Sequence, residues 1–163
     1  VKKWEWGNSG DPKMYHDVET RKNSITYRGN MARLIEVLIN EGKYKKAEEI
    51  ADLAQEKMPV DLFGYYTFLE PFVGAYYEIG QKNKGRSLFK KISVKYQENL
   101  TYYSRISESN KSKYVQTIYS DIERYKSLVD TVSYYESEEF IKAEMERFNG
   151  FLKLFTEKDS ENL

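Results

Sequence analysis

The sequence predicts an all-α fold, an array of about six helices in which two helical hairpins precede a longer C-terminal helix pair. Apolar residues recur at steps of three and four positions along most of the 163 residues, as they do on one face of an α-helix. Glycines directly follow two of these runs, where they end helices by adopting a left-handed conformation. No segment combines strict alternation with hairpin turn residues, so a β-sheet is not expected.

The first hairpin is expected between about Ser24 and Pro59. Its first helix ends at Gly42, and its second stops at Pro59 because the residue before a proline avoids the α conformation. Small residues dominate one stripe of the second helix. The apolar stripes of the two helices are Tyr27, Met31, Leu34, Ile35 and Leu38, then Tyr44, Ala47, Ile50, Ala51 and Ala54.

The second hairpin is expected as helices at about 63–79 and 82–98, which meet at Gly80. Thr67 and Glu70 have the spacing of a capping box, and Pro71 suits a first helical turn, where proline is tolerated. Residues 24–99 are therefore assigned to the two hairpins. Their apolar stripes here are Phe68, Leu69, Phe72, Val73, Tyr76 and Ile79, then Leu88, Phe89, Ile92 and Tyr96.

Residues 100–156 are expected to form the longer helix pair, packed on the hairpins. The first helix has a heptad-like seam that is too short to require a coiled coil, and Ser137 caps the second. Residues 157–163 are predicted to be disordered. The two apolar stripes are Val115, Ile118, Ile122, Tyr125, Val129 and Val132, then Ile141, Met145, Phe148, Leu152 and Phe155.

Residues 1–23 are expected to form an irregular arm. The segment GNSGDP is a cluster of turn-forming residues. Trp4 and Trp6 lie beside it, and a free tail rarely contains two tryptophans. The arm either packs on the helices or is the stub of a linker to another domain.

The two hairpins share an internal register, because Gly42 and Gly80 lie 80 − 42 = 38 positions apart. Ala47 and Gly85 each follow one of these glycines by five positions, so each hairpin has a small residue where its helices must approach closely. The matching positions are Met31, Leu34, Ile35, Leu38, Ala47, Ala51 and Pro59 in the first hairpin, and Leu69, Phe72, Val73, Tyr76, Gly85, Phe89 and Gln97 in the second.

This pattern resembles the tetratricopeptide repeat family over about residues 27–98, although it lacks the family's tryptophan and has large residues at two small positions. A plain helical bundle is the alternative interpretation. The resemblance implies that neighbouring hairpins stack and that the inner faces of their first helices form a groove for a protein or peptide segment. The residues expected on those faces are Arg33, Glu36, Asn40, Glu70 and Tyr77.

The composition narrows the classes of partner. Lys and Arg together number 26, as do Asp and Glu, so the net charge is zero and nucleic acid is not expected as the main partner. The chain has no cysteine, which excludes disulfides and thiolate chemistry. No apolar run is long enough to span a membrane. The chain begins with Val1 rather than Met, which predicts an excised or processed piece of a longer protein.

The sequence contains no motif that predicts catalysis, a cofactor or a metal site. His16 is the only histidine, and the carboxylates near it match no usual ligand spacing. Phosphate-binding glycine motifs are absent. Paired glutamates such as Glu48–Glu49 lie in lysine-rich helical stretches, as solvated faces do. Tyrosine pairs are typical of either packing or anchoring a partner; they are Tyr65–Tyr66, Tyr76–Tyr77, Tyr102–Tyr103 and Tyr134–Tyr135.

A wider set of short motifs covers about residues 4–105. These are Trp6, Gly7, Asn8, Asp11, Pro12 and Tyr15, then Arg28, Asn30, Ala32, Arg33 and Leu34, then Met58 and Pro59, and finally Ala75, Tyr76, Tyr77 and Gly80. They resemble the soluble C-terminal part of a family of large bacterial membrane proteins of unknown function, whose membrane portion resembles protein O-mannosyltransferases. Gly29 stands where that family usually has a second asparagine.

The wider resemblance implies a non-catalytic appendage, tethered to a multi-spanning membrane body of the glycosyltransferase type and lying in the periplasm, or else in the cytoplasm. Its partner would be a protein or peptide segment, with its own membrane domain among the candidates. Two other hypotheses stay open: a free-standing helical-repeat adaptor, and a small enzyme that uses Tyr and Glu residues.

Overall fold

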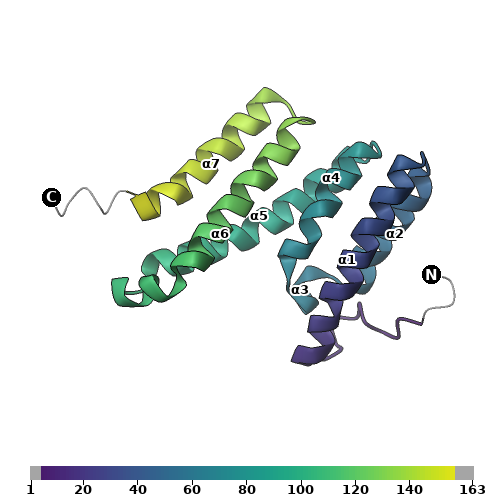
Figure 1. Ribbon diagram of the computed structural model, residues 1–163, viewed down its shortest axis with the longest axis horizontal. Helices are drawn as coiled ribbons and strands as arrows, with labels where there is room; N and C mark the ends of the chain where they lie inside the picture. The colour runs from purple at the N-terminus through teal and green to yellow at the C-terminus, as the bar shows by residue number, and fades with distance from the viewer. Residues whose placement is uncertain (1–4, 157–163) are drawn as a thin grey trace. The chain divides into compact units, whose positions relative to one another are not determined.

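The computed structural model describes residues 5–156, and within that range the chain is all-α, as predicted (Figure 1). Trp4 and the predicted disorder of residues 157–163 lie outside the described residues. A single-turn helix and a 3₁₀ turn add to the expected helices. The elements are α1 (Val18–Asn40), α2 (Tyr44–Lys57), α3 (Val60–Phe63), the 3₁₀ helix η1 (Tyr66–Leu69), α4 (Glu70–Glu78), α5 (Lys82–Arg105), α6 (Glu108–Ser133) and α7 (Glu138–Thr156).

The chain divides into two compact units that meet within α5, one ending at Gly85 and the other beginning at Arg86. The sequence analysis placed the end of the hairpins after residue 99. The difference arises because α5 is one continuous helix, and only its first turn lies with the first unit. None of the helices described is both long and apolar enough to cross a membrane.

In the first unit, α1 begins at Val18, earlier than the expected start at about Ser24. Asp17 explains the early start, because its carboxylate accepts a hydrogen bond of 2.7 Å from the backbone N–H of Thr20. That hydrogen bond lowers the pKa of Asp17 below its usual value. The irregular arm is therefore shorter than the expected residues 1–23.

The turns at Gly42 and Gly80 have the same backbone structure. Gly42 has a φ of 69° and Gly80 a φ of 79°, both in the left-handed region. In each turn the glycine N–H donates to the carbonyl three residues before it, and the next N–H donates to the carbonyl five residues before that donor. This pair of hydrogen bonds is the Schellman motif, which satisfies carbonyls at the end of α1 and of α4. The two hairpins thus turn in the same way.

Ala47 and Gly85 lie at close helix contacts in the first unit. Ala47 is completely buried in the hairpin of α1 and α2. Gly85 is buried, and a Cβ on it would come within 2.8 Å of the ring of Tyr77. A larger side chain at either position would therefore separate the paired helices. The fully buried side chains around them are Arg28, Ile35, Ala51, Ala54, Leu69, Phe72 and Val73.

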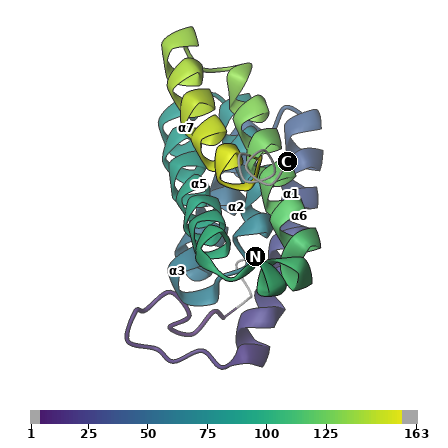
Figure 2. The same ribbon diagram turned by 90° about the vertical axis from the view of Figure 1, so that its left-hand side faces the viewer.

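The N-terminal arm packs on this unit and folds back beside α3 and the start of α1 (Figure 2). The His16 ring lies 4.4 Å from the Phe63 ring, and Trp6 contacts Tyr27 edge to face. Gly10 lies so close to the carbonyl oxygen of Glu56 that a Cβ would be 2.3 Å from it. Between the packing and linker-stub alternatives, the described part of the arm therefore matches packing.

The second unit contains the rest of α5 together with α6 and α7. Tyr125 of α6 is its centre: the ring stacks on Tyr96 of α5 and meets the edges of Phe148 and Phe151 of α7. The predicted Ser137 cap is confirmed, because its hydroxyl accepts from the backbone N–H of Phe140. α6 starts at Glu108, and Ser107 precedes it as the N-cap residue.

Candidate functional site

A groove lies between α1 and α4, the first helices of the two hairpins. Its volume is about 410 Å³, within the range of small binding sites. Its floor is apolar and includes buried side chains from both helices. The lining residues are Ala32, Arg33, Ile35, Glu36 and Ile39 from α1, and Pro71, Phe72, Gly74, Ala75 and Glu78 from α4.

The structure brings together two of the five residues expected in a groove. Arg33 and Glu36 line it, and both side chains are exposed. Asn40 is the last residue of α1 and Glu70 the first of α4, and neither lines the groove. Asn40 and Glu70 therefore lie outside the groove.

The expectation for Tyr77 is corrected. Tyr77 is only 6% exposed, and its ring packs over Gly85 rather than facing the groove. The missing side chain at Gly85 creates the space that the ring fills. Tyr77 therefore joins α4 to the first turn of α5 and is not available to a partner.

Glu78 lines the groove at the end of α4 but is not among the five residues expected there. The internal register contained a signal for it, because Glu78 is the counterpart of Asn40 at a spacing of 38 (40 + 38 = 78). The small floor residues Ala32, Gly74 and Ala75 were missed because small apolar residues give no signal of a surface on their own.

The charges on the groove are uneven. Arg33, Glu36 and Glu78 are exposed, and within residues 5–156 none of them forms an ion pair or side-chain hydrogen bond. Glu36 lies in the C-terminal part of α1, and Glu78 is the last residue of α4. Helix C-termini have a partial negative charge, which adds to the two carboxylates. That end of the groove is therefore acidic.

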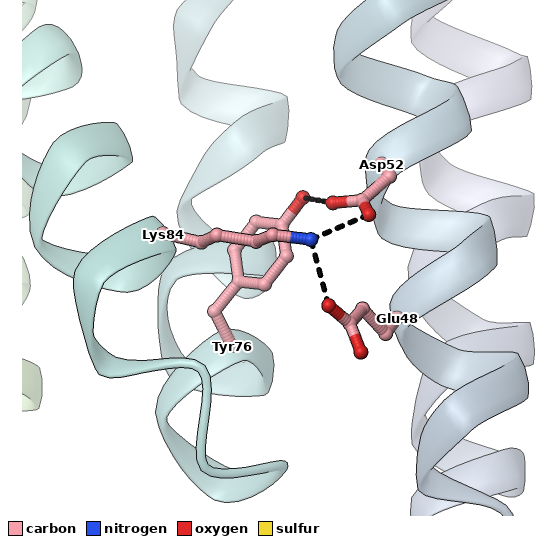
Figure 3. A network of polar contacts seen from close by, with 4 residues as sticks. All are labelled: Glu48, Asp52, Tyr76 and Lys84. Atoms are coloured by element: carbon pink, nitrogen blue, oxygen red, sulfur yellow. Dashed lines mark hydrogen bonds and ion pairs between the residues drawn. The ribbon is translucent and has the colours of Figure 1, made fainter.

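A polar clamp, made of Glu48, Asp52, Tyr76 and Lys84, joins α2, α4 and the first turn of α5 (Figure 3). Lys84 of α5 donates hydrogen bonds of 2.7 Å to Glu48 and 2.6 Å to Asp52, both on α2. Tyr76 of α4 donates its hydroxyl to the other oxygen of Asp52 at 2.9 Å. Because α4 also forms one wall of the groove, the clamp fixes that wall relative to α2.

Two members of the clamp, Lys84 and Tyr76, have shifted pKa values. Hydrogen bonds to Asp52 and then Glu48 raise the pKa of Lys84 above its usual value, because both carboxylates favour the ammonium form. Burial, followed by the hydrogen bond to Asp52, raises the pKa of Tyr76 well above its usual value. Lys84 therefore stays cationic and Tyr76 stays neutral throughout the neutral range. That constancy suits a structural role more than proton transfer.

Arg28 anchors the connection between the hairpins. Its guanidinium is completely buried and donates to the carbonyl oxygens of Met58 at 2.6 Å, Gly64 at 2.6 Å and Tyr65 at 3.2 Å. Gly64 and Tyr65 both have positive φ values, 69° and 48°. Burial lowers the pKa of Arg28 to about 10, which still leaves it cationic at neutral pH. The arginine thus holds a strained turn against α1 and sets where α4 begins.

The second unit has a separate, more open hollow of about 680 Å³ on α5. Tyr102, one member of a predicted tyrosine pair, is 61% exposed on its rim, and Phe151 of α7 contributes to its floor. Arg105 is the cation on its rim. The other lining residues are Val94, Gln97, Glu98, Thr101 and Ile106.

No group of three or more His, Asp or Glu side chains is arranged to hold a metal ion in the part of the chain that the structure describes. His16 instead contacts the carbonyl oxygen of Ser9 at 2.9 Å and packs on Phe63.

Comparison of the chain with protein-family models, with curated proteins and with solved structures finds no match.

Proposed function

We propose that this chain is a non-catalytic interaction module that binds a protein segment in the groove between α1 and α4. The observation that supports the proposal most is the groove itself, with a buried apolar floor and a rim of charged side chains that have no partner among the described residues. An apolar floor supplies affinity, and polar groups around it supply orientation. The matching turns at Gly42 and Gly80, and the small residues after them, support a tetratricopeptide-like hairpin array.

The groove favours binding over the alternative of a small enzyme. Catalytic carboxylates work by having a shifted pKa, which requires burial or a close charged partner. Glu36 and Glu78 are exposed and have no such partner among the described residues. Tyr76 is buried, but its hydroxyl is bonded to Asp52 within the clamp.

We further propose that this chain is tethered to a membrane protein. Only the wider motif resemblance supports this part of the proposal. In that version the chain is the appendage of a glycosyltransferase-like membrane body and lies in the periplasm. A free-standing adaptor would use the same groove. The coding sequence upstream of residue 1 separates the two: many apolar segments in frame support the tether, and a stop codon directly upstream overturns it.

The groove is tested by selecting displayed peptides on the purified chain and measuring their binding to two variants. Ala32→Phe fills the groove between α1 and α4, whereas Ala143→Phe makes the same change on an exposed position of α7. The selected peptides should lose binding to the first variant and keep it with the second. Equal binding to both variants would overturn the proposal, provided that circular dichroism shows both to be folded.

A further inference from the structure

We propose that the groove recognises a segment in which an apolar side chain lies next to Lys or Arg. The inference rests on the proposed function and names the class of ligand for that site. The apolar side chain would lie on the floor, and the cationic group would lie at the end lined by Glu36 and Glu78.

The floor determines the apolar half of the ligand. Phe72 and Ile35 are completely or almost completely buried beneath the groove, and Ala75 is 8% exposed. Ala32 and Gly74 contribute almost no side-chain volume, which is why a hollow exists between two packed helices. A groove of about 410 Å³ has room for one large apolar side chain with its backbone, and burying such a side chain contributes about 1.5–3 kcal/mol.

The charged side chains on the rim of the groove determine the charged half of the ligand. The groove lining contains one cation, Arg33, and two carboxylates, so its formal charge is 1 − 2 = −1 in a chain whose net charge is zero. Glu36 and Glu78 lie toward the C-terminal ends of α1 and α4, where both helix dipoles are negative. A cationic side chain at this end of the groove would be attracted by both carboxylates.

An acidic segment would fit less well. Its carboxylate would find one guanidinium, Arg33, within a lining that also presents Glu36 and Glu78. Like charges placed together disfavour a partner more strongly than a single exposed ion pair favours it. Arg33 instead suits the backbone carbonyls of a segment whose basic residue lies at the acidic end.

The test uses short synthetic peptides blocked at both ends, in which an apolar residue is followed by Lys, by Gln or by Glu. Fluorescence anisotropy with the whole chain should rank them Lys above Gln above Glu. The preference for Lys over Gln should be about three- to tenfold, as expected for one or two partly exposed ion pairs, and should weaken with added salt.

Charge variants then locate the preference. The double variant Glu36→Gln with Glu78→Gln should abolish the Lys preference, whereas Glu123→Gln with Glu139→Gln makes the same charge change on exposed positions of the second unit and should leave it intact. Replacing both groove carboxylates with lysine should reverse the ranking.

The outcomes separate the two proposals. If Ala32→Phe removes binding but the peptides show no preference for Lys, the ligand class is wrong and the groove stands. If Lys peptides bind and the two double variants behave alike, the acidic end is not the recognition site and the inference fails. If Ala32→Phe binds every peptide as well as the original chain, the groove and the inference fail together.

Discussion

The ring of Tyr77 fills the space where a side chain on Gly85 would be, because a Cβ on Gly85 would lie 2.8 Å from two of the ring carbons. Contacts of that length do not occur between packed carbon atoms, so the ring and the glycine are complementary in shape. Tyr77 is 6% exposed, and little room is left into which it could move. The second hairpin therefore depends on having no side chain at residue 85.

We expect Gly85→Ala to destabilise the chain relative to a matched change in α1. Gly29→Ala also replaces a helical glycine, but a Cβ there meets nothing within 4 Å. Replacing glycine with alanine raises helix propensity by roughly 1 kcal/mol in both variants. The difference between their free energies of unfolding therefore measures the steric clash between the new Cβ at residue 85 and the ring of Tyr77. That difference should be about 1–3 kcal/mol in urea unfolding, the usual effect of overpacking. Equal stability of the two variants would show that Tyr77 can move aside.

Replacing Arg28 should be among the most damaging single changes in the first unit. Arg28→Met keeps most of the volume but leaves the carbonyls of Met58 and Gly64 without their donor, while the carbonyl of Tyr65 keeps the N–H of Phe68. Each unsatisfied buried group costs about 1–3 kcal/mol, so we expect a loss of roughly 2–4 kcal/mol. Arg28→Lys should recover part of it, since one ammonium cannot reproduce the spread of a guanidinium. Thermal unfolding measures both, and a wild-type midpoint for Arg28→Met would contradict the anchoring role.

The clamp should contribute only modestly to the free energy of unfolding, and its contribution should depend on the salt concentration. Lys84 and Asp52 are both close to half exposed, so their ion pair is screened by water. A double-mutant cycle between Lys84→Met and Asp52→Asn should give a coupling of about 0.2–1 kcal/mol. The coupling should shrink as the ionic strength rises. A coupling that does not change with salt would show that the contact is not mainly electrostatic.

Stability should fall at alkaline pH. The pKa of Tyr76 is raised in the folded state from the ordinary value of 10.0, mainly by burial. Above that pH the unfolded chain releases the phenolic proton while the folded chain retains it, so the rise in pH stabilises the unfolded state relative to the folded state. The contribution of the neutral Tyr76 hydroxyl to the stability of the folded state is complete below pH 10.0 and is lost as the pH rises further. Tyr76→Phe should reduce the slope of unfolding free energy against pH in that range, and an unchanged slope would contradict the assignment.

Two variants of Tyr125 separate its ring from its hydroxyl in the second unit. The hydroxyl accepts a hydrogen bond of 2.7 Å from Gln97, and the completely buried ring stacks on Tyr96. Tyr125→Phe should cost about 0.5–1.5 kcal/mol, as for one hydrogen bond. Tyr125→Ala should cost about 3–5 kcal/mol, because it leaves a large cavity. If the two variants lose the same stability in denaturant unfolding, the ring packing is not central.

Local features of the fold could be predicted from the sequence. Gly42 and Gly80 end their helices as expected, and Ser137 caps the last helix, because these effects act within a few residues of backbone. The start of α1 was placed too late because the Asp17 cap was not recognised. The end of α5 was placed too early, at about residue 98, whereas the helix continues to Arg105.

Arg33 and Glu36 could be placed on the groove because the inner face of a first helix follows from its period. Glu78 could have been predicted from the repeat, because it lies 38 positions after Asn40. Tyr77 could not be assigned correctly, because its orientation depends on the space at Gly85 eight positions later. The buried cation Arg28 and the clamp partner Lys84 gave no signal, since arginine and lysine are usually exposed.

The sequence by itself determined which segments are helical, where two of the turns lie and which residues repeat at a spacing of 38, because hydrogen bonds and side-chain period within a helix are local. The tertiary structure alone decided that Tyr77 turns inward, that Arg28 holds the turn at Gly64, and that Glu36 and Glu78 line one groove. The physical reason is that successive residues point about 100° apart around a helix, so the neighbour that each one meets depends on how the helices are rotated and how closely they approach.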